Sequence, residues 1–254
     1  MRTRVYVDGF NLYYGALKGT PFRWLDLVKL SKLLLPAEHN IDRLRYFTAR
    51  VSGIANAGAP ARQHRYLQAL ETLPEVRVHL GRFLAKTAWR PLTNLPVADR
   101  KIDAPERVTL PAGSHPVEGG QTLPVGRYPV PNAGKKKPRK SSKPVPDAVI
   151  AEIHVLEEKG SDVNLGAHLL NDAWKGLFDA AVVISNDTDL VTPIQMVTVE
   201  QKKTVFVVCP GRWQMAPRLR SVASYARHVR RAMLRDAQFP EQIPGTAIAR
   251  PSQW

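Results

Sequence analysis

The sequence contains a single cysteine, Cys209, in 254 residues. One thiol excludes an intramolecular disulfide and any zinc site built from paired cysteines. Because Cys209 follows the apolar run 205–208, we expect a buried structural thiol at the end of a strand. The sequence also lacks a GxGxxG motif and a Walker P-loop, which argues against a Rossmann dinucleotide site and against a P-loop NTPase.

No apolar run is long enough to span a bilayer, and no signal-peptide core follows the first residues. We therefore expect a cytoplasmic protein without a membrane segment. Hydrophobic residues make up 44% of the chain, which is enough to fill a core.

Acidic residues are scarce relative to basic ones. There are 22 Asp and Glu against 37 Lys and Arg, which gives a formal net charge of +15. So large an excess favours a polyanionic partner, with nucleic acid as the first class and an anionic membrane surface as the second. The alternative is that much of the charge lies in one solvated segment.

Apolar strand patterns alternate with helical patterns along most of the chain. The elements expected, in order, are strand 2–7, helix 25–35, strand 43–51, helix 60–72, strand 75–83, a short strand after 148, helix 162–175, strand 180–184, a helix containing Pro193, strand 203–209, and an Arg-rich helical segment over 214–237. This alternation predicts an α/β fold with a central, mainly parallel sheet that the strand 203–209 closes.

Residues 90–147 interrupt this alternation. They are rich in proline, contain the basic run KKKPRKSSK at 135–143, and show no helical period. We expect an insertion or flexible loop whose charge suits a nucleic-acid-binding arm, with a solubilising segment as the alternative. The predicted domain therefore covers 1–225 with this interruption, and a basic helix end and tail follow over 226–254.

Carboxylates stand where an open α/β sheet keeps its ligands, beyond the carboxyl ends of its strands. Asp8 follows the first strand, Asp187 and Asp189 follow the strand 180–184, and Asp162 lies near the start of a helix. Carboxylates gathered in one cleft repel each other unless a hard divalent cation takes up the charge. The pattern therefore predicts a Mg²⁺ or Mn²⁺ site that activates water for attack on a phosphodiester.

Each of these residues also has a purely structural interpretation. Asp187 or Asp189 could cap the helix that follows, and Asp162 could be a first-turn acid that complements the helix dipole. Asn11 could be an N-cap, or it could orient a carboxylate or the scissile phosphate. The conjunction favours a site, because independent caps need not fall on one edge of a sheet.

Three segments, "YVDGFNLYY", "KGSDVNLGAHLL" and "VVISNDTDL", occur in this order and together resemble the NYN domain family of PIN-like nucleases, which includes the LabA-like proteins. The resemblance covers about 1–90 and 148–225. It implies a PIN-like three-layer α/β/α fold, an acidic Mg²⁺ or Mn²⁺ site and cleavage of RNA. The same resemblance places the family's acidic positions and its asparagine on Asp8, Asp162, Asp187, Asp189 and Asn11.

The chain departs from the family pattern at two positions. Many relatives carry an Asp where this chain has His168, and many carry a Gly where it has Asn186. His168 lies about 240° round an ideal helix from Asp162. We therefore expect a core or surface histidine rather than a ligand. If the site needs the missing acid, metal affinity falls or activity is lost.

Basic residues supply the expected contacts to phosphate, since Arg and Lys bind phosphates with little sequence preference. The residues proposed for nucleic-acid binding are Lys159, Lys135, Lys136, Lys137, Arg139, Lys140, Arg212, Arg218 and Arg220. Trp213 and Tyr225 lie among the C-terminal arginines, where aromatic rings can stack on unpaired bases. Part of this segment also has an apolar face typical of an amphipathic helix.

The leading hypothesis is a metal-dependent endoribonuclease with RNA as its partner. A second hypothesis is an RNA-binding or regulatory protein without catalysis, suggested by His168 and the basic insertion. A third is an NADH-dependent hydroxylase of a pyridine compound, because some proteins that resemble this family carry that name. No flavin or nicotinamide signature supports the third hypothesis, and the sequence does not decide between a monomer and a homodimer.

Overall fold

The structure is a computed structural model that describes residues 1–53, 56–91, 114–116, 150–211 and 214–252. The chain divides into two compact units. The first consists of Met1–Phe83 together with Glu158–Trp254, and the second is Leu84–Glu157. The candidate carboxylates all belong to the first unit. Within the described residues, no helix has the length and apolar composition needed to cross a bilayer.

A parallel sheet forms the centre of the first unit. Its strands lie in the order β3-β2-β1-β6-β7-β8, and each pair of neighbours is parallel. The strands are β1 (Arg2–Asp8), β2 (Asn40–Ala49), β3 (Val76–Pro91), β6 (Ala180–Ile184), β7 (Thr204–Cys209) and β8 (Tyr225–His228). The central strands are apolar along almost their whole length because both faces of the sheet are covered.

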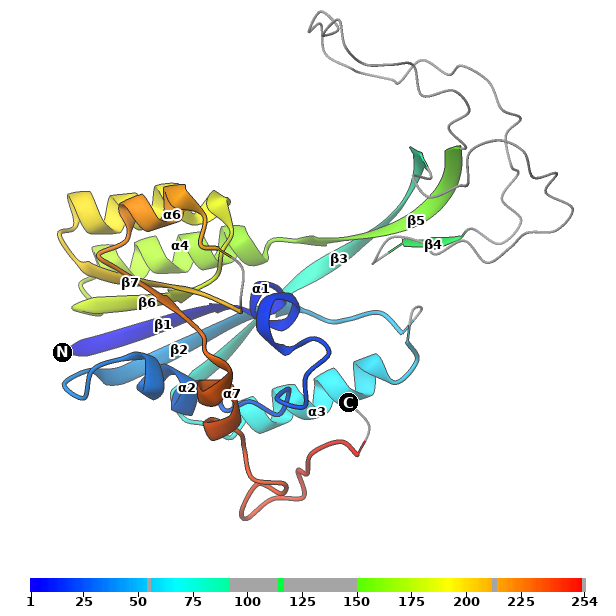
Figure 1. The fold of residues 1–254 in the computed structure, drawn as a ribbon, viewed down its shortest axis with the longest axis horizontal. Helices are drawn as coiled ribbons and strands as arrows, with labels where there is room; N and C mark the ends of the chain where they lie inside the picture. Colours follow the sequence, from blue (N-terminus) through cyan, green and yellow to red (C-terminus); the bar gives the residue numbers. More distant parts are fainter. Residues whose placement is uncertain (54–55, 92–113, 117–149, 212–213, 253–254) are drawn as a thin grey trace, which may run out of the picture. The chain divides into compact units, whose positions relative to one another are not determined.

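Helices cover the two faces of this sheet (Figure 1). One face carries α2 (Leu27–Leu34), α3 (Ala59–Glu71) and α7 (Arg231–Asp236), and the other carries α4 (Ser161–Trp174), α5 (Val191–Gln195) and α6 (Pro217–Val222). Successive β1 side chains point to opposite faces: Val5 and Val7 are buried under the first set of helices, and Tyr6 is buried under the second. This three-layer α/β/α arrangement confirms the predicted fold class.

Local sequence signals set the bounds of several helices. The side chain of Asp26 caps α2 by accepting hydrogen bonds from the backbone nitrogens of Val28 and Lys29, at 2.9 and 3.0 Å. α2 ends before Pro36. α3 carries Pro60 in its first turn, where the backbone N–H that proline lacks would have no partner within the helix. Short helical turns also follow β1 and β6: α1 (Gly9–Leu12), the π-helix η1 (Tyr13–Leu17), the 3₁₀-helix η2 (Thr188–Leu190) and the π-helix η3 (Met196–Glu200).

The prediction of one helical segment over 214–237 is wrong. α6 ends at Val222, β8 follows, and α7 begins only at Arg231, so β8 extends the sheet beyond β7. Ser224 starts the pairing: its backbone nitrogen donates to the Val205 carbonyl at 2.9 Å, and its hydroxyl accepts from the Val205 nitrogen at 3.0 Å. Pairing with the open edge of β7 outweighs the helical spacing of apolar residues. The boundary drawn between 225 and 226 therefore falls inside a strand.

The second unit contains β4 (Ser114–Pro116), the last part of β3 and most of β5 (Ile150–Lys159), whose final two residues belong to the first unit. β4 pairs antiparallel with β5, so a short strand lies inside the segment 90–147 that was expected to be an insertion or flexible loop. The basic run of that segment, Lys135, Lys136, Lys137, Arg139 and Lys140, lies outside the described residues. Its proposed role in nucleic-acid binding stays a prediction.

Candidate active site

Asp8 is the last residue of β1, and the chain turns directly from it into α1. Its Oδ1 accepts a hydrogen bond from the backbone nitrogen of Asn11 at 2.9 Å, so Asp8 caps α1. Gly9 makes this turn possible, because a Cβ there would lie 2.7 Å from the carbonyl oxygen of Phe47 in β2. The Asp-Gly pair thereby holds a carboxylate that is only 5% exposed against the neighbouring strand.

Ser185 connects Asp8 to the segment that follows β6. Its hydroxyl donates to Asp8 Oδ2 at 2.9 Å and accepts from the backbone nitrogen of Asp187 at 3.1 Å. Burial raises the pKa of Asp8, while the hydrogen bonds from Asn11 and Ser185 act in the opposite direction. The carboxylate is therefore held in place by donors from two different segments.

Asn11 positions the segment after β6 and does not cap a helix, so the N-cap alternative for Asn11 is wrong. Its Oδ1 accepts from the backbone nitrogen of Asn186 at 3.0 Å. The side chain of Asn186 continues the connection, since its Nδ2 donates to the Gln214 carbonyl at 3.2 Å and its Oδ1 accepts from the Ala216 nitrogen at 2.9 Å. Asn186 thus links α1 to the chain after β7.

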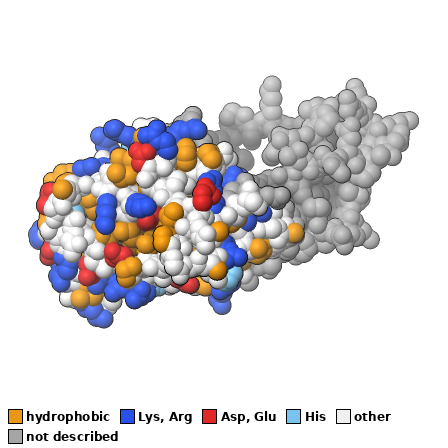
Figure 2. All heavy atoms as spheres, turned by 90° about the horizontal axis from the view of Figure 1, so that it is seen from below, with side chains coloured by type: hydrophobic (Ala, Val, Ile, Leu, Met, Phe, Trp, Pro, Cys, Tyr) orange, Lys and Arg blue, Asp and Glu red, His pale blue; other side chains and the backbone are white. Residues whose placement is uncertain are grey.

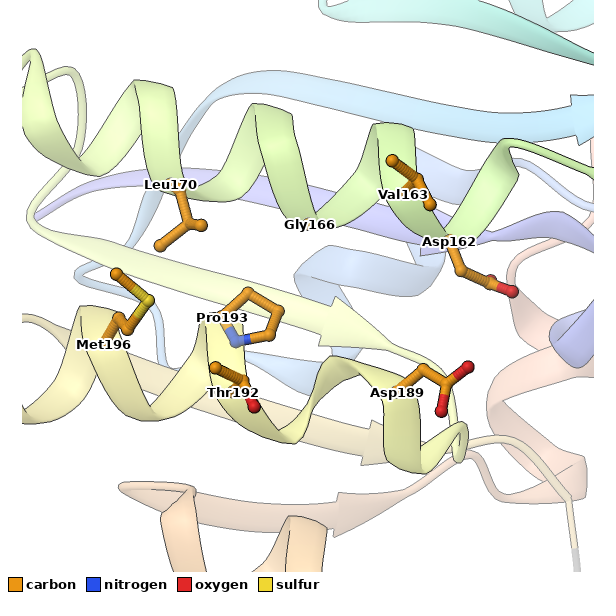
Figure 3. A pocket seen from close by; sticks show the side chains of 8 residues that line it. All are labelled: Asp162, Val163, Gly166, Leu170, Asp189, Thr192, Pro193 and Met196. Atoms are coloured by element: carbon orange, nitrogen blue, oxygen red, sulfur yellow. The ribbon is translucent and has the colours of Figure 1, made fainter.

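Asp187 and Asp189 occupy different positions in the turn after β6. Asp187 is half-buried, and its Oδ1 accepts from the backbone nitrogen of Asp189 at 2.9 Å, which caps η2. The capping interpretation is therefore correct for Asp187. Asp189 is exposed, it caps none of the helices in the part of the chain that the structure describes, and its carboxylate lies at the mouth of a pocket between α4 and α5 (Figure 3).

Asp162 lies in the first turn of α4 and faces the same end of this pocket as Asp189 (Figure 3). The cavity has a volume of about 200 Å³ and is lined by Asp162, Val163, Gly166, Leu170, Asp189, Thr192, Pro193 and Met196. Burial is the main reason that the pKa of Asp162 is raised to about 7. Repulsion from the other carboxylates adds to it, namely those of Asp8, Asp187, Glu158 and Asp189. The four predicted acids therefore share one electrostatic environment.

Glu158 belongs to this group and was missed by the sequence analysis. It lies near the end of β5, and its Oε1 accepts from the backbone nitrogen of Ser161 at 3.1 Å. Gly81 in β3 leaves room for it, because a Cβ at Gly81 would lie 2.7 Å from that Oε1. Gly81 pairs with Ala49, the last residue of β2, so Glu158 stands at the same edge of the sheet as Asp8. An acid at a strand end was the signal that could have found it.

We call the five carboxylates Asp8, Glu158, Asp162, Asp187 and Asp189 the acidic site. Its donors are all carboxylate oxygens, which is the ligand chemistry of Mg²⁺ and Mn²⁺. In the described part of the chain, no three His, Cys, Asp or Glu side chains are grouped closely enough to form a metal cage. Like charges in a poorly solvated cleft repel each other, and a divalent cation would offset that repulsion. The donor atoms of the acidic site are therefore those that Mg²⁺ and Mn²⁺ prefer. That these residues together bind a metal ion stays a prediction.

His168 packs against aromatic rings. Its ring centroid lies 4.4 Å from that of His79 and 5.7 Å from that of Phe47. Burial lowers the pKa of His168, and the positive charge of Arg45 adds to this effect. These contacts are those expected of a packed histidine.

A buried ionic cluster under α4 was also missed by the sequence analysis. Its centre is Asp172, which is 1% exposed. Arg45 donates to both carboxylate oxygens at 2.9 and 3.1 Å, Tyr6 donates its hydroxyl at 2.8 Å, and Arg4 forms an ion pair at 3.0 Å. Burial opposes ionisation, but these donors lower the pKa of Asp172. The cluster ties α4 to β1 and β2, and thereby fixes the helix that carries Asp162.

The basic residues described near the site lie on different elements. Arg218 and Arg220 are exposed on α6, which packs beside η2, and Lys159 is exposed at the end of β5. Lys and Arg side chains are also more widespread than acidic ones over the face in Figure 2. Arg212 and Trp213 lie outside the described residues.

Comparison with known proteins gives one substantial sequence match. No protein-family model matches the chain. The chain is 29% identical over 276 residues to 6-hydroxy-3-succinoylpyridine 3-monooxygenase HspA of Pseudomonas putida, and the match covers all of this chain and 75% of that protein. Among solved structures, a protein of unknown function from Vibrio parahaemolyticus has 13% identity and a TM-score of 0.48, covering 91% of this chain and 93% of that one.

Proposed function

We propose that the protein is a metal-dependent endoribonuclease of the NYN, PIN-like type. The observation that carries this proposal is the acidic site, with carboxylates from β1, β5, α4 and the turn after β6. Burial, and after it repulsion from the other four carboxylates, raises the pKa of Asp162 to about 7. A protein with a formal charge of +15 that carries several acids at one edge of its sheet suits a polyanionic substrate and a cation between them.

The carboxylates of the acidic site differ in their exposure. Asp8 is buried and fixed by Ser185 and Asn11, whereas Asp162 and Asp189 face the pocket. Asp8, Asp162, Asp187 and Asp189 would hold Mg²⁺ or Mn²⁺, which when bound supplies an activated water and offsets charge on the phosphodiester. Arg218, Arg220 and Lys159 contact phosphate groups on either side of the bond that is cleaved.

An RNA-cleavage assay with Mn²⁺ or Mg²⁺ tests this function. We expect the Asp8→Asn and Asp189→Asn variants to cleave about 100-fold more slowly or worse, a loss equivalent to about 2.7 kcal/mol of transition-state stabilisation. Asp179→Asn is the matched control, because Asp179 is exposed and lies beside the start of β1, at the opposite end of the sheet. Equal cleavage by wild type and Asp8→Asn would point to a contaminating nuclease and contradict the proposal.

Metal binding provides a test that does not depend on activity. Mn²⁺ should raise the melting temperature of the wild-type protein, because a ligand that binds only the folded state stabilises it. The same addition should have a smaller effect on Asp8→Asn. Salt-dependent RNA binding without metal-dependent turnover would instead favour the non-catalytic alternative.

A second function is favoured by one observation, the 29% identity with a protein named as a 6-hydroxy-3-succinoylpyridine 3-monooxygenase. On this proposal the chain hydroxylates a pyridine ring, with NADH as the electron donor and O₂ as the oxidant. The apolar wall of the pocket between α4 and α5 suits an aromatic ring. The test is NADH oxidation and product mass with 6-hydroxy-3-succinoylpyridine, and a flat NADH trace across pyridine substrates contradicts it.

A further inference from the structure

We propose that a second pocket, beside η1, binds a nucleotide of single-stranded RNA adjacent to the acidic site; this inference rests on the proposed ribonuclease function. The pocket has a volume of about 570 Å³, within the range of small-molecule sites. It is lined by Tyr14, Gly15, Ala16, Lys18, Thr20, Phe22, Gly211, Val229, Arg231 and Leu234.

The walls of this pocket start at the carboxyl ends of parallel strands. η1 follows α1 and therefore β1, Gly211 lies just after the end of β7, and Val229 and Arg231 lie just after the end of β8. Asp8 ends β1 at the same edge of the sheet. The second pocket and the acidic site therefore both lie at the carboxyl edge of the sheet, where ligands of α/β proteins bind, although their walls come from helices on opposite faces.

The lining of the pocket combines positive charge with aromatic rings. Lys18 Nζ lies 4.9 Å from the centroid of the Tyr14 ring, and the guanidinium carbon of Arg231 lies 5.3 Å from the centroid of the Phe22 ring. Among the described residues that line the pocket, none is acidic. Such a site selects a ligand that is both anionic and aromatic, which is the combination that a nucleotide offers.

Tyr14 is the side chain best placed to stack on a base. It is 58% exposed, although it follows the half-buried Tyr13 in the same short helix and contacts the Tyr13 ring edge to face at 5.2 Å. The contact with Tyr13 and the Lys18 ammonium limit the orientations of its ring. An exposed but oriented ring costs little entropy to stack on an unpaired base.

The backbone at the bottom of the pocket is closely packed. Gly211 has φ 76° and approaches Gly15 so closely that a Cβ at Gly211 would collide with the Gly15 carbonyl. Val229 and Leu234 are buried and form an apolar floor. The pocket is therefore formed before any ligand arrives, which reduces the cost of binding.

The spacing along the chain connects the two sites. Asp8 caps α1, and Tyr14 follows six residues later in η1, so one short segment of the chain contributes to both sites. A strand of RNA whose scissile phosphate lies at the acidic site would place a neighbouring base over Tyr14. Its phosphate would then face Lys18 and Arg231.

Fluorescence anisotropy with a labelled, unstructured oligoribonucleotide in EDTA tests the proposal, because cleavage is then absent. We expect Tyr14→Ala to weaken binding by about 10-fold, since the base loses its stacking partner. Lys18→Gln should weaken binding and make it less dependent on salt, because one phosphate contact is lost. Lys175→Gln is the matched control, since Lys175 is exposed at the far end of α4. An RNA duplex should compete poorly, because its paired bases cannot enter the pocket.

The outcomes separate this proposal from the ribonuclease function. The pocket proposal is overturned if the Tyr14→Ala and Lys18→Gln variants fold normally and bind the oligoribonucleotide as tightly as Lys175→Gln does. This holds whatever the cleavage assay shows. Weakened binding in both variants supports it. If Asp8→Asn also cleaves as well as wild type, the nuclease function fails while the pocket stands.

Discussion

The hydroxyl of Ser185 donates a hydrogen bond to Oδ2 of Asp8 across 2.9 Å, and both residues are buried. The contact joins the end of β1 to the residue after β6, a neighbouring strand, and the two residues are 177 positions apart in the sequence. The same hydroxyl accepts from the Asp187 nitrogen. One small side chain thus holds the carboxylate of Asp8 and the backbone of Asp187, two residues of the acidic site.

Replacing Ser185 with alanine should destabilise the fold by about 1–3 kcal/mol, because a buried carboxylate oxygen and a backbone donor each lose a partner. Urea unfolding at pH 7 measures the change. Ser221→Ala is the control, since the exposed Ser221 hydroxyl only donates to the Arg218 carbonyl. Equal unfolding free energies for the two variants would show that the Asp8 contact has no energetic weight.

Asp162→Asn should stabilise the protein in a pH-dependent way. The folded-state pKa of about 7 lies above the ordinary value of 3.8, so the folded chain holds its proton to higher pH than the unfolded chain. The contribution of Asp162 to the stability of the wild type therefore falls as pH rises from about 4 to about 7, and it is lost above pH 7. The asparagine side chain does not titrate in this range, so the variant lacks this loss of stability.

Melting temperatures measured in EDTA between pH 4 and 8 test this prediction. The advantage of Asp162→Asn over wild type should grow up to about pH 7 and then level off. Asp179→Asn shows the effect of removing one negative charge elsewhere on the surface. An advantage of Asp162→Asn that is constant across the range, or absent, would contradict the raised pKa of Asp162.

Asp172→Asn should cost about 3–5 kcal/mol of folding free energy, because it leaves two arginines without their shared buried carboxylate. Asp42→Asn removes the other, more exposed partner of Arg4 and should cost about 0–1 kcal/mol. Urea unfolding of both variants gives the comparison. A small loss for Asp172→Asn would mean that Arg4 and Arg45 find other partners.

Asn11→Ala should loosen the turn after β6 without unfolding the sheet. The backbone N–H of Asn186 loses the oxygen that accepts its hydrogen bond, so hydrogen exchange at this N–H should accelerate. The free energy of unfolding should fall by about 1 kcal/mol. Asn171→Ala, an exposed change within α4, is the control. Unchanged exchange at Asn186 would show that the chain after β7 holds the turn alone, through the Asn186 side chain.

The central strands and most helices were predictable because their signals are local. The apolar runs of β1, β6 and β7, the cap at Asp26 and the proline in the first turn of α3 each act within a few residues. The strand–helix cadence then predicts a parallel sheet, and the carboxyl ends of its strands identify Asp8, Asp187 and Asp189. These inferences need no knowledge of distant contacts.

Other features depend on partners far away in the sequence. β8 was mistaken for part of a helix because its apolar spacing fits a helix, and only the open edge of β7 makes a strand the better solution. Asp172 carries no local signal in the sequence, because Arg4 and Arg45, which bind it, lie on two distant strands.

The sequence by itself therefore determined the α/β class, the positions of the main strands and helices and most of the acids that follow them, because these depend on local propensity and periodicity. Only the tertiary structure decided how the acids are positioned. Ser185 holds Asp8, Asn11 holds the turn that carries Asp187 and Asp189, and the missing side chain of Gly81 leaves room for Glu158. Hydrogen bonds and close approaches between distant segments leave no periodic trace in a sequence. They appear only once the strands lie side by side.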